Sequence, residues 1–406
     1  MSILSEVRGF SAPTRKTLFV QWLTSIGYFS VIPFLVVYLV RFQHFSAEFA
    51  TLQLSLFLIG QYGATFLGGL MTDRFSPNLT MKYGLILQIA CYLVFFTGIS
   101  QSSIICVLST TIGISKGLFT PAAKTLVARV SAGSNKILLF SFRSTVNNVG
   151  VALGSAIGGL FITANSASFF AIAAASQLIA LAMLFTLPTP AAIPADHSHS
   201  AAPPVNKGTV RQLGSNLSFI AACLLYCAFN FIYMQLESAF PLFSSQKWGA
   251  MAVSAIFMMN AAVVILLQVL VNVYLNKWLS PWLSMCLGFM AFSLTFSLLG
   301  SAESLGAFII LIGFYTLGEI TVDPTIDAVT SEAIPARMLG TAFGVLGIAG
   351  LIGGVSGNAF AGRFLSLTLN QPATLWHSCL AVSALGVGLT LLFSLKKFYI
   401  KQTQAG

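Results

Sequence analysis

Three carboxylates stand out in an apolar stretch near residue 320. Glu319, Asp323 and Asp327 recur every four residues in a chain whose charged residues make up only 7% of the total. On a helix of 3.6 residues per turn, this spacing places the three side chains within about 80° of arc. A carboxylate at the centre of a bilayer costs on the order of 2.5–3.5 kcal/mol, so none of the three is expected to face lipid. We therefore predict that this helix borders a cavity enclosed by protein.

Two of these carboxylates have the spacing expected of a proton-carrying pair. Glu319 and Asp323 lie one helical turn apart, and two negative charges at that spacing repel each other. We therefore expect Asp323 and Glu319 to take up and release protons. Glu237 is the other acid in an apolar run. It is a second proton site, a cation-recognising group, or an ordinary residue where its span ends beside Pro241.

Basic and polar side chains in other apolar runs are candidates for the same cavity. Lys116 lies in mid-span, a position that suits snorkelling to the interface poorly. The sequence leaves open whether Lys116 pairs with Glu319 or meets the substrate. The candidate cavity residues are Lys116, Arg143, Asn147, Tyr233 and Gln235.

The composition is that of a multi-pass membrane protein. Hydrophobic residues make up 56% of the 406 residues, and the mean hydropathy is +0.88. Repeated apolar runs of about twenty residues indicate helices that span a bilayer, since lipid leaves unpaired backbone groups unsatisfied. We predict an all-α membrane protein with about twelve transmembrane helices. The predicted spans are 17–40, 47–70, 80–99, 103–127, 137–163, 167–187, 217–242, 249–275, 281–300, 304–328, 340–366 and 374–395.

The distribution of Lys and Arg predicts the orientation of the chain. The net charge is +10, and these residues lie mostly between spans, which favours a bias of positive charge toward the cytoplasm over nucleic-acid binding. Both termini and the central loop are therefore predicted to be cytoplasmic. All six cysteines fall in apolar runs without a metal-binding or disulfide pattern, so we expect no metal.

A polar segment divides the chain into two halves. Residues 188–215 are rich in Pro, Ala and Ser and are predicted to form a flexible cytoplasmic linker. The linker separates a six-helix bundle at 1–187 from a second six-helix bundle at 216–406.

The two halves are weak sequence repeats. A shift of 203 positions places Pro121 on Pro324 and Gly150 on Gly353 without a gap. Parallel repeats of six helices are typical of transporters whose two domains rock against each other. The two bundles are therefore predicted to be pseudo-symmetric.

Charged residues at matching positions of the repeats often have opposite signs. The same shift pairs Lys116 with Glu319, Lys124 with Asp327, and Arg129 with Glu332. Because a pseudo-two-fold axis places matching helices opposite each other, we predict that Lys124 and Asp327 form a gate near the cytoplasmic end. Snorkelling of Lys124 to the interface is the alternative.

The loop at residues 68–78, GGLMTDRFSPN, resembles the signature loop of the major facilitator superfamily in Gly69, Asp73 and Arg74. The residues that follow Phe75 depart from the family pattern. The resemblance implies the major facilitator fold and an Asp that contacts basic groups and the start of the eleventh span, closing the cytoplasmic side. With the counterparts from the repeat, the candidate gating residues are Asp73, Arg74, Arg129, Lys124, Asp327, Lys277 and Glu332.

The fifth span contains Gly150, Gly154, Gly158 and Gly159, which resemble the glycine motif of proton-coupled exporters in this superfamily. Ser155 stands where the family usually has Pro. Small residues at this spacing also allow helices to pack closely, which is how the motif acts. Over nearly its whole length, the chain resembles twelve-span bacterial drug:proton antiporters and siderophore exporters.

These features predict a secondary active transporter in a bacterial inner membrane. The leading function is proton-coupled efflux of a small amphipathic compound, drug-like or siderophore-like, by alternating access. The alternative is proton-coupled uptake of a small metabolite, an anion if Lys116 and Arg143 meet it; a channel and a transport-dead sensor fit less well. No nucleotide-binding or hydrolase motif occurs, so we expect no enzyme activity and no cofactor. The expected partners are the substrate, protons and the lipid bilayer, with no nucleic acid, and the protein is expected to be a monomer.

The predicted gate is testable by exchanging its charges. Lys124→Asp and Asp327→Lys should each abolish substrate-driven proton movement in membrane vesicles, because each places two like charges together. The double variant should restore it. Inactivity of the double variant alongside both single variants would count against pairing.

Overall fold

The computed structural model describes residues 10–130, 136–163, 167–187, 212–248, 250–365 and 372–403. These residues are almost entirely helical, and no strand occurs among them. The predicted all-α fold is confirmed. The predicted linker lies outside the described residues, apart from positions 212–215.

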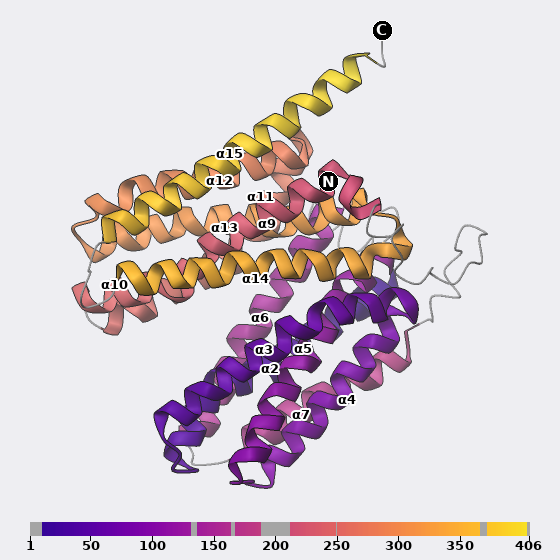
Figure 1. Ribbon diagram of the computed structural model, residues 1–406, viewed down its shortest axis with the longest axis vertical. Coiled ribbons are helices and arrows are strands. Elements are labelled where there is room, and N and C mark those ends of the chain that lie inside the picture. Colours follow the sequence, from indigo (N-terminus) through magenta and orange to yellow (C-terminus); the bar gives the residue numbers. More distant parts are fainter. Residues whose placement is uncertain are drawn as a thin grey trace. The chain divides into compact units, whose positions relative to one another are not determined.

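The helices of the first half follow the predicted spans closely. They are α2 (Ala12–Arg41), α3 (Ala47–Arg74), α4 (Pro77–Phe96), α5 (Ser102–Val130), α6 (Lys136–Thr163) and α7 (Ser168–Phe185). Figure 1 traces them in indigo to magenta.

The second half has one more helix, because its first span is interrupted. Its helices are α9 (Leu217–Glu237), α10 (Ala239–Trp248), α11 (Ala250–Trp278), α12 (Pro281–Leu298), α13 (Leu305–Ala333), α14 (Leu339–Phe364) and α15 (Pro372–Thr403). Short 3-10 turns follow α12 at Leu299–Ser301 and precede α14 at Ala336–Met338.

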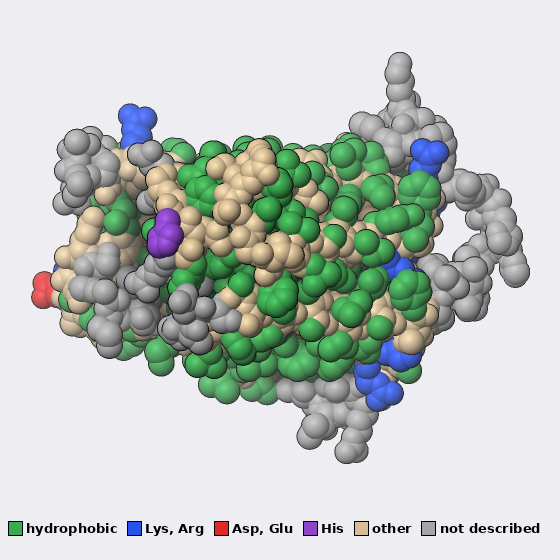
Figure 2. Space-filling view, turned by 90° about the horizontal axis from the view of Figure 1, so that it is seen from below, with side chains coloured by type: hydrophobic (Ala, Val, Ile, Leu, Met, Phe, Trp, Pro, Cys, Tyr) green, Lys and Arg blue, Asp and Glu red, His purple; other side chains and the backbone are tan. Residues whose placement is uncertain are grey.

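Eleven helical stretches in the described part of the chain are long and apolar enough to cross a membrane. One of them, Leu217–Trp248, combines α9 and α10. The remaining long helix, α6, occupies the predicted fifth span. Large apolar side chains remain exposed on many helices, such as Ile59 at 67% and Leu266 at 66%. On the face drawn in Figure 2, hydrophobic side chains cover most of the surface, as a lipid-facing protein requires.

The chain divides into two compact units. Unit 1 comprises Met1–Ser134, Arg143–Arg211 and Ile334–Ile348, and unit 2 comprises Asn135–Phe142, Gln212–Ala333 and Ala349–Gly406. The start of α6 therefore belongs to unit 2, and the start of α14 belongs to unit 1. The first residues of these two helices correspond to each other in the sequence repeat of 203 positions. The predicted domain borders at 187 and 216 stay a prediction.

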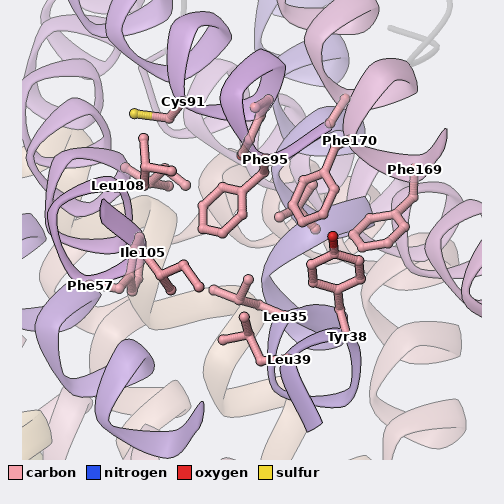
Figure 3. Close-up of a cluster of buried hydrophobic side chains, with 14 of the residues drawn as sticks. Leu35, Tyr38, Leu39, Phe57, Cys91, Phe95, Ile105, Leu108, Phe169 and Phe170 are labelled. Atoms are coloured by element: carbon pink, nitrogen blue, oxygen red, sulfur yellow. The ribbon is translucent and has the colours of Figure 1, made fainter. Parts of the chain in front are cut away.

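The core of unit 1 is built from bulky side chains of five helices. Figure 3 shows Leu35 and Tyr38 of α2 beside Phe95 of α4 and Phe170 of α7. The Phe95 and Phe170 rings stack with their centroids 5.0 Å apart, and Phe57 of α3 closes the cluster near Ile105 and Leu108 of α5. Aromatic and branched side chains of this size fill the space between helices.

Glycines bring α6 against the backbone of α2. A Cβ atom on Gly154 would lie 2.5 Å from the carbonyl oxygen of Ile26, and one on Gly150 would lie 2.9 Å from that of Trp22. Gly158 approaches the Ser30 carbonyl just as closely. Only a residue without a side chain permits these approaches.

The same contact recurs in unit 2, at the positions that the repeat assigns. Gly353 and Gly357 of α14 lie against the carbonyl oxygens of Cys227 and Phe231 of α9. The sequence repeat therefore reflects a repeated helix contact.

Prolines interrupt α5 and α13 at matching positions, Pro121 and Pro324. A proline inside a helix leaves the carbonyl four residues earlier without its N–H partner. In unit 2 the side chain of Asn272 on α11 supplies the missing donor, with its Nδ2 2.7 Å from the Ile320 oxygen. The backbone between Glu319 and Asp323 is thus held by a side chain of another helix.

The glycine contact predicts opposite effects at two neighbouring positions. Gly154→Ala should lower stability by about 1–3 kcal/mol, because its Cβ collides with the α2 backbone. Gly159→Ala should be neutral or stabilising by up to about 1 kcal/mol, since its Cβ would lie 3.6 Å from the Phe34 ring, an ordinary contact. The midpoints of thermal unfolding in detergent measure both effects. Equal midpoints for the two variants would contradict the packing described here.

Candidate functional site

Glu319 of α13 binds a polar side chain of α11 within unit 2. Its Oε2 accepts a hydrogen bond of 2.6 Å from Nδ2 of Asn260, which also donates to Oγ1 of Thr316 at 3.2 Å. Thr316 lies almost one turn before Glu319 on α13. A carboxylate within a spanning helix is therefore solvated by an amide from the neighbouring helix.

The three predicted proton-carrying residues interact through their charges. Asp323 and Glu237 both act on Glu319. The hydroxyl of Tyr233 donates a hydrogen bond to Glu237, and the Tyr233 ring stacks on Phe229 with centroids 5.8 Å apart. Within the described ranges, no three His, Cys, Asp or Glu side chains are grouped as metal ligands.

Two further polar residues of unit 2 are used in packing. Gln235 is fully buried, and its Nε2 donates to the carbonyl oxygens of Phe231 at 2.8 Å and Gly357 at 3.2 Å. The Tyr315 hydroxyl donates to the carbonyl of Ile232 at 3.0 Å. Gln235, predicted to be a cavity residue, is therefore placed at the contact between α9 and α14.

Lys116 lies at the centre of α5 in unit 1. Its Nζ lies over the ring of Tyr28 on α2, 4.2 Å from the ring centroid. The positive charge of Arg143 on α6 acts on it. Lys116 and Arg143, predicted as cavity residues, are thus electrostatically linked.

Asn147 joins α6 to α2 one turn beyond Arg143. Its Oδ1 accepts hydrogen bonds from Oγ of Ser25 at 2.7 Å and from Nε2 of Gln21 at 3.2 Å. Both donors are buried. The predicted cavity residues Lys116, Arg143 and Asn147 therefore lie on the helices that surround α2 in unit 1.

Asp73, at the end of α3, binds the start of α14. Its two carboxylate oxygens accept hydrogen bonds from the backbone N–H groups of Gly340 at 2.8 Å and Thr341 at 2.6 Å. Free N–H groups at a helix start favour a carboxylate. The contact has the arrangement that the family resemblance implies.

Arg129, at the end of α5, completes this contact. It donates from NH2 to Asp73 at 3.4 Å, and from NH2 and Nε to the carbonyl of Ala336 at 2.7 and 3.1 Å. Gly69 is in contact with the Gly340 carbonyl, and a Cβ on Gly340 would lie 2.5 Å from the Gly69 oxygen. The glycines allow α3 to approach α14 closely enough for the carboxylate to reach.

The remaining gating candidates lie apart from this contact. Arg74 is exposed and lies over Phe75, and Lys277 is exposed and lies over Trp278. Glu332 is exposed too, and its charge acts on Lys136 at the start of α6. Glu332 therefore acts on the start of α6, which corresponds to the start of α14 in the sequence repeat.

Lys124 and Asp327 are both buried, at 8% and 1% exposure. Within unit 1, the Lys124 Nζ lies 5.7 Å from the ring centroid of Phe343 on α14. The predicted contacts of Lys124 with Asp327 and of Lys116 with Glu319 join residues of different units and stay predictions.

Sequence reasoning missed the neutral partners of the charged residues. Asn260 binds Glu319, Tyr28 supports Lys116, and Asn272 caps the Ile320 carbonyl. Asn260 and Asn272 are polar residues within an otherwise apolar span, which was an available signal. Tyr28 had no comparable signal, because aromatic residues are common throughout the chain.

A model of the Major Facilitator Superfamily matches residues 17–358. Together with the spanning helices and the paired helix contacts, this match shows that the chain belongs to the major facilitator superfamily. It is a multi-pass membrane transporter.

Relatives and a solved structure resemble the chain over nearly its full length. It is 25% identical to the uncharacterized MFS-type transporter YqjV of Bacillus subtilis, over 96% of this chain and 94% of that protein. It is 21% identical to the multidrug resistance protein MdtH of Aeromonas salmonicida, over 91% of each chain. The transporter FucP, solved in an outward conformation, matches with a TM-score of 0.74 at 14% identity, over 94% of this chain and 99% of that one. At that identity, the match shows the fold alone.

The contact at the start of α14 predicts the effect of a single substitution. Asp73→Asn should lower stability by about 1–3 kcal/mol, because an amide cannot accept hydrogen bonds from both N–H groups and loses the charge. The midpoint of thermal unfolding measures the effect. Glu303→Gln, which makes the same change at an exposed position, is the control. An unchanged midpoint in Asp73→Asn would show that the contact contributes no stability.

Proposed function

We propose that this protein is a proton-coupled exporter of a small amphipathic compound, drug-like or siderophore-like, that works by alternating access. The observation that carries the proposal is the group formed by Glu319, Asp323 and Glu237 in unit 2. The charges of Asp323 and Glu237 both act on Glu319 within spanning helices. An energy-coupled transporter needs a group that changes its charge during the cycle.

The surroundings of Glu319 suit such a change. The amide of Asn260 binds its carboxylate, and the charges of Asp323 and Glu237 act on it. A rearrangement that moves any of these three groups would change the affinity of Glu319 for a proton. We propose that substrate binding and proton binding alternate in this way.

Two features favour export. The relative MdtH is described as a multidrug resistance protein, and the glycines of α6 lie against α2 at the positions that resemble the exporter motif. Aromatic side chains near the carboxylates, such as Phe229 and Tyr233, suit amphipathic compounds.

We further propose that the contacts of Asp73 and Arg129 with the start of α14 break and re-form in each cycle. Their place at helix ends, on the side where Lys and Arg are concentrated, supports a gate at the cytoplasmic side. The proposed location is the bacterial inner membrane, with both termini in the cytoplasm and the protein acting as a monomer.

The second candidate function is proton-coupled uptake of a small metabolite. Lys116 and Arg143 favour it, because two linked cations in spanning helices suit an anionic nutrient. Uptake predicts accumulation of the compound in whole cells, whereas export predicts proton movement out of inverted vesicles when the compound is added.

Collapse of a pH gradient in inverted membrane vesicles tests the coupling. Lipophilic cations, lipophilic anions and iron-chelating metabolites are added to vesicles with wild-type protein, Glu319→Gln or Asp323→Asn. We expect at least one compound to collapse the gradient with the wild type, and this collapse to be lost in both variants, because neither amide can carry a proton.

Glu303→Gln is the matched control and should behave as the wild type, since Glu303 is exposed and lies outside the cluster. Full collapse with Glu319→Gln and Asp323→Asn would exclude these residues as proton carriers. No collapse with any compound, despite protein in the membrane, would favour uptake.

A further inference from the structure

Two lysines from different helices reach the end of α7 in unit 1. The ammonium group of Lys16 on α2 donates hydrogen bonds to the hydroxyl of Thr186 at 3.1 Å and to its carbonyl oxygen at 3.5 Å. The ammonium group of Lys82 on α4 lies over the ring of Phe185, 3.9 Å from its centroid. Phe185 is the last residue of α7, and Thr186 follows it. The tertiary structure therefore holds two positive charges at one helix end.

This helix end attracts more positive charge than its own dipole balances. The C-terminal end of a helix carries about half a negative charge. Within the described ranges, the contacts of both ammonium groups are with neutral atoms. Arg15, beside Lys16, is exposed and adds a third positive charge. An excess of positive charge remains at the end of α7, which favours binding of an anion.

The end of α7 lies near the membrane surface, with apolar side chains on its exposed face. The helix is long and apolar enough to span a membrane, and it ends at Phe185. Phe185 is 68% exposed, and Ala182 and Leu178, three and seven residues earlier, are exposed as well. On a helix this spacing places the three on one face. An apolar strip therefore runs from Phe185 into the membrane.

A second apolar strip begins at Lys82 on α4. Ile86, Ala90 and Leu93 follow it at helical spacing, and all three are exposed. The side chain of Lys82 thus lies where an exposed apolar face ends, as expected of a lysine that extends to the interface.

The two strips belong to helices that lie side by side. Near one end, Nδ2 of Asn78 on α4 donates to the carbonyl oxygen of Leu184 on α7 at 3.1 Å. Near the other end, the rings of Phe95 and Phe170 stack at 5.0 Å between centroids. Positive charge and exposed apolar surface therefore adjoin on neighbouring helices.

We propose that the end of α7 binds an anionic phospholipid, with its phosphate at Lys16 and Lys82 and its acyl chains along the exposed strips of α4 and α7. Ammonium groups form charge-assisted hydrogen bonds with phosphate oxygens, and lysines at the membrane surface attract anionic lipids. A soluble phosphate would use the lysines alone, whereas a lipid also covers the apolar strips. The site lies apart from the carboxylates of unit 2 and goes beyond the proposed transport function.

Photolabelling of the full-length protein in nanodiscs tests the proposal. The nanodiscs consist of phosphatidylcholine with a small fraction of a phosphatidylglycerol probe that has a diazirine in one acyl chain. A phosphatidylcholine probe with the same acyl chains is the zwitterionic match. Mass spectrometry locates and quantifies the label, and the unfolding midpoint shows whether each variant has folded.

We expect the phosphatidylglycerol probe to label α4 and α7 at least about fivefold more than the phosphatidylcholine probe, because each lysine favours the anionic headgroup. The double variant Lys16→Gln/Lys82→Gln should lower this labelling at least about fivefold. Lys16→Arg/Lys82→Arg should retain most of it, since both charges remain. The comparison of the two probes on the wild type tests the proposal even if the double variant does not fold.

Lys277→Gln is the matched control. Lys277 is exposed near the end of α11 in unit 2, and its ammonium group also lies over an aromatic ring, 5.2 Å from the Trp278 centroid. The variant removes the same charge at a different span and should leave labelling of α4 and α7 unchanged.

Three results would overturn the proposal. The first is equal labelling of α4 and α7 by the two probes on the wild type. The second is unchanged labelling in a folded double variant. The third is loss of labelling in excess inorganic phosphate but not in chloride of the same ionic strength, which would identify a soluble phosphate as the occupant.

Discussion

The structure depends on how ionisable side chains are accommodated inside helices that face lipid. Bulk water is replaced there by specific protein groups, each from a neighbouring helix. Asn260 of α11 solvates Glu319 of α13, Tyr28 of α2 supports Lys116 of α5, and the start of α14 receives Asp73 of α3. Because each charge is stabilised by a different helix, a shift of one helix changes the energy of that charge. This coupling between charge and helix position is what a transporter requires.

Close helix approach is the second requirement, and glycine provides it. The glycines of α6 and α14 allow backbone contact with α2 and α9, and Gly69 and Gly340 allow the same between α3 and α14. Without these approaches, the carboxylate of Asp73 would not reach two backbone N–H groups. Helix packing and the polar contacts therefore depend on each other.

The two halves share their backbone contacts but differ in their charges. Pro121 and Pro324 interrupt α5 and α13 at matching positions, and the central residues of these helices are Lys116 and Glu319. Internal repeats of this kind are common in transporters. The opposite charges give unit 1 and unit 2 different chemistry: one has linked cations beside an aromatic wall, and the other has linked carboxylates beside an amide.

The sequence alone determined the helices and their approximate bounds, because spans in lipid require long apolar runs and all twelve predicted spans coincide with long helices or a helix pair. It also singled out Glu319, Asp323, Lys116 and Asp73, since charged residues are rare and costly in such runs. Only the tertiary structure decided which side chains bind these charged residues. It assigned Asn260 to Glu319 and Tyr28 to Lys116, and it placed Gln235 in helix packing. The physical reason is that the free-energy cost of burying a charged side chain depends on that residue and the apolar span around it, which the sequence shows. A hydrogen bond between two helices depends on their rotation and spacing, which the sequence does not show when the helices are distant in the chain.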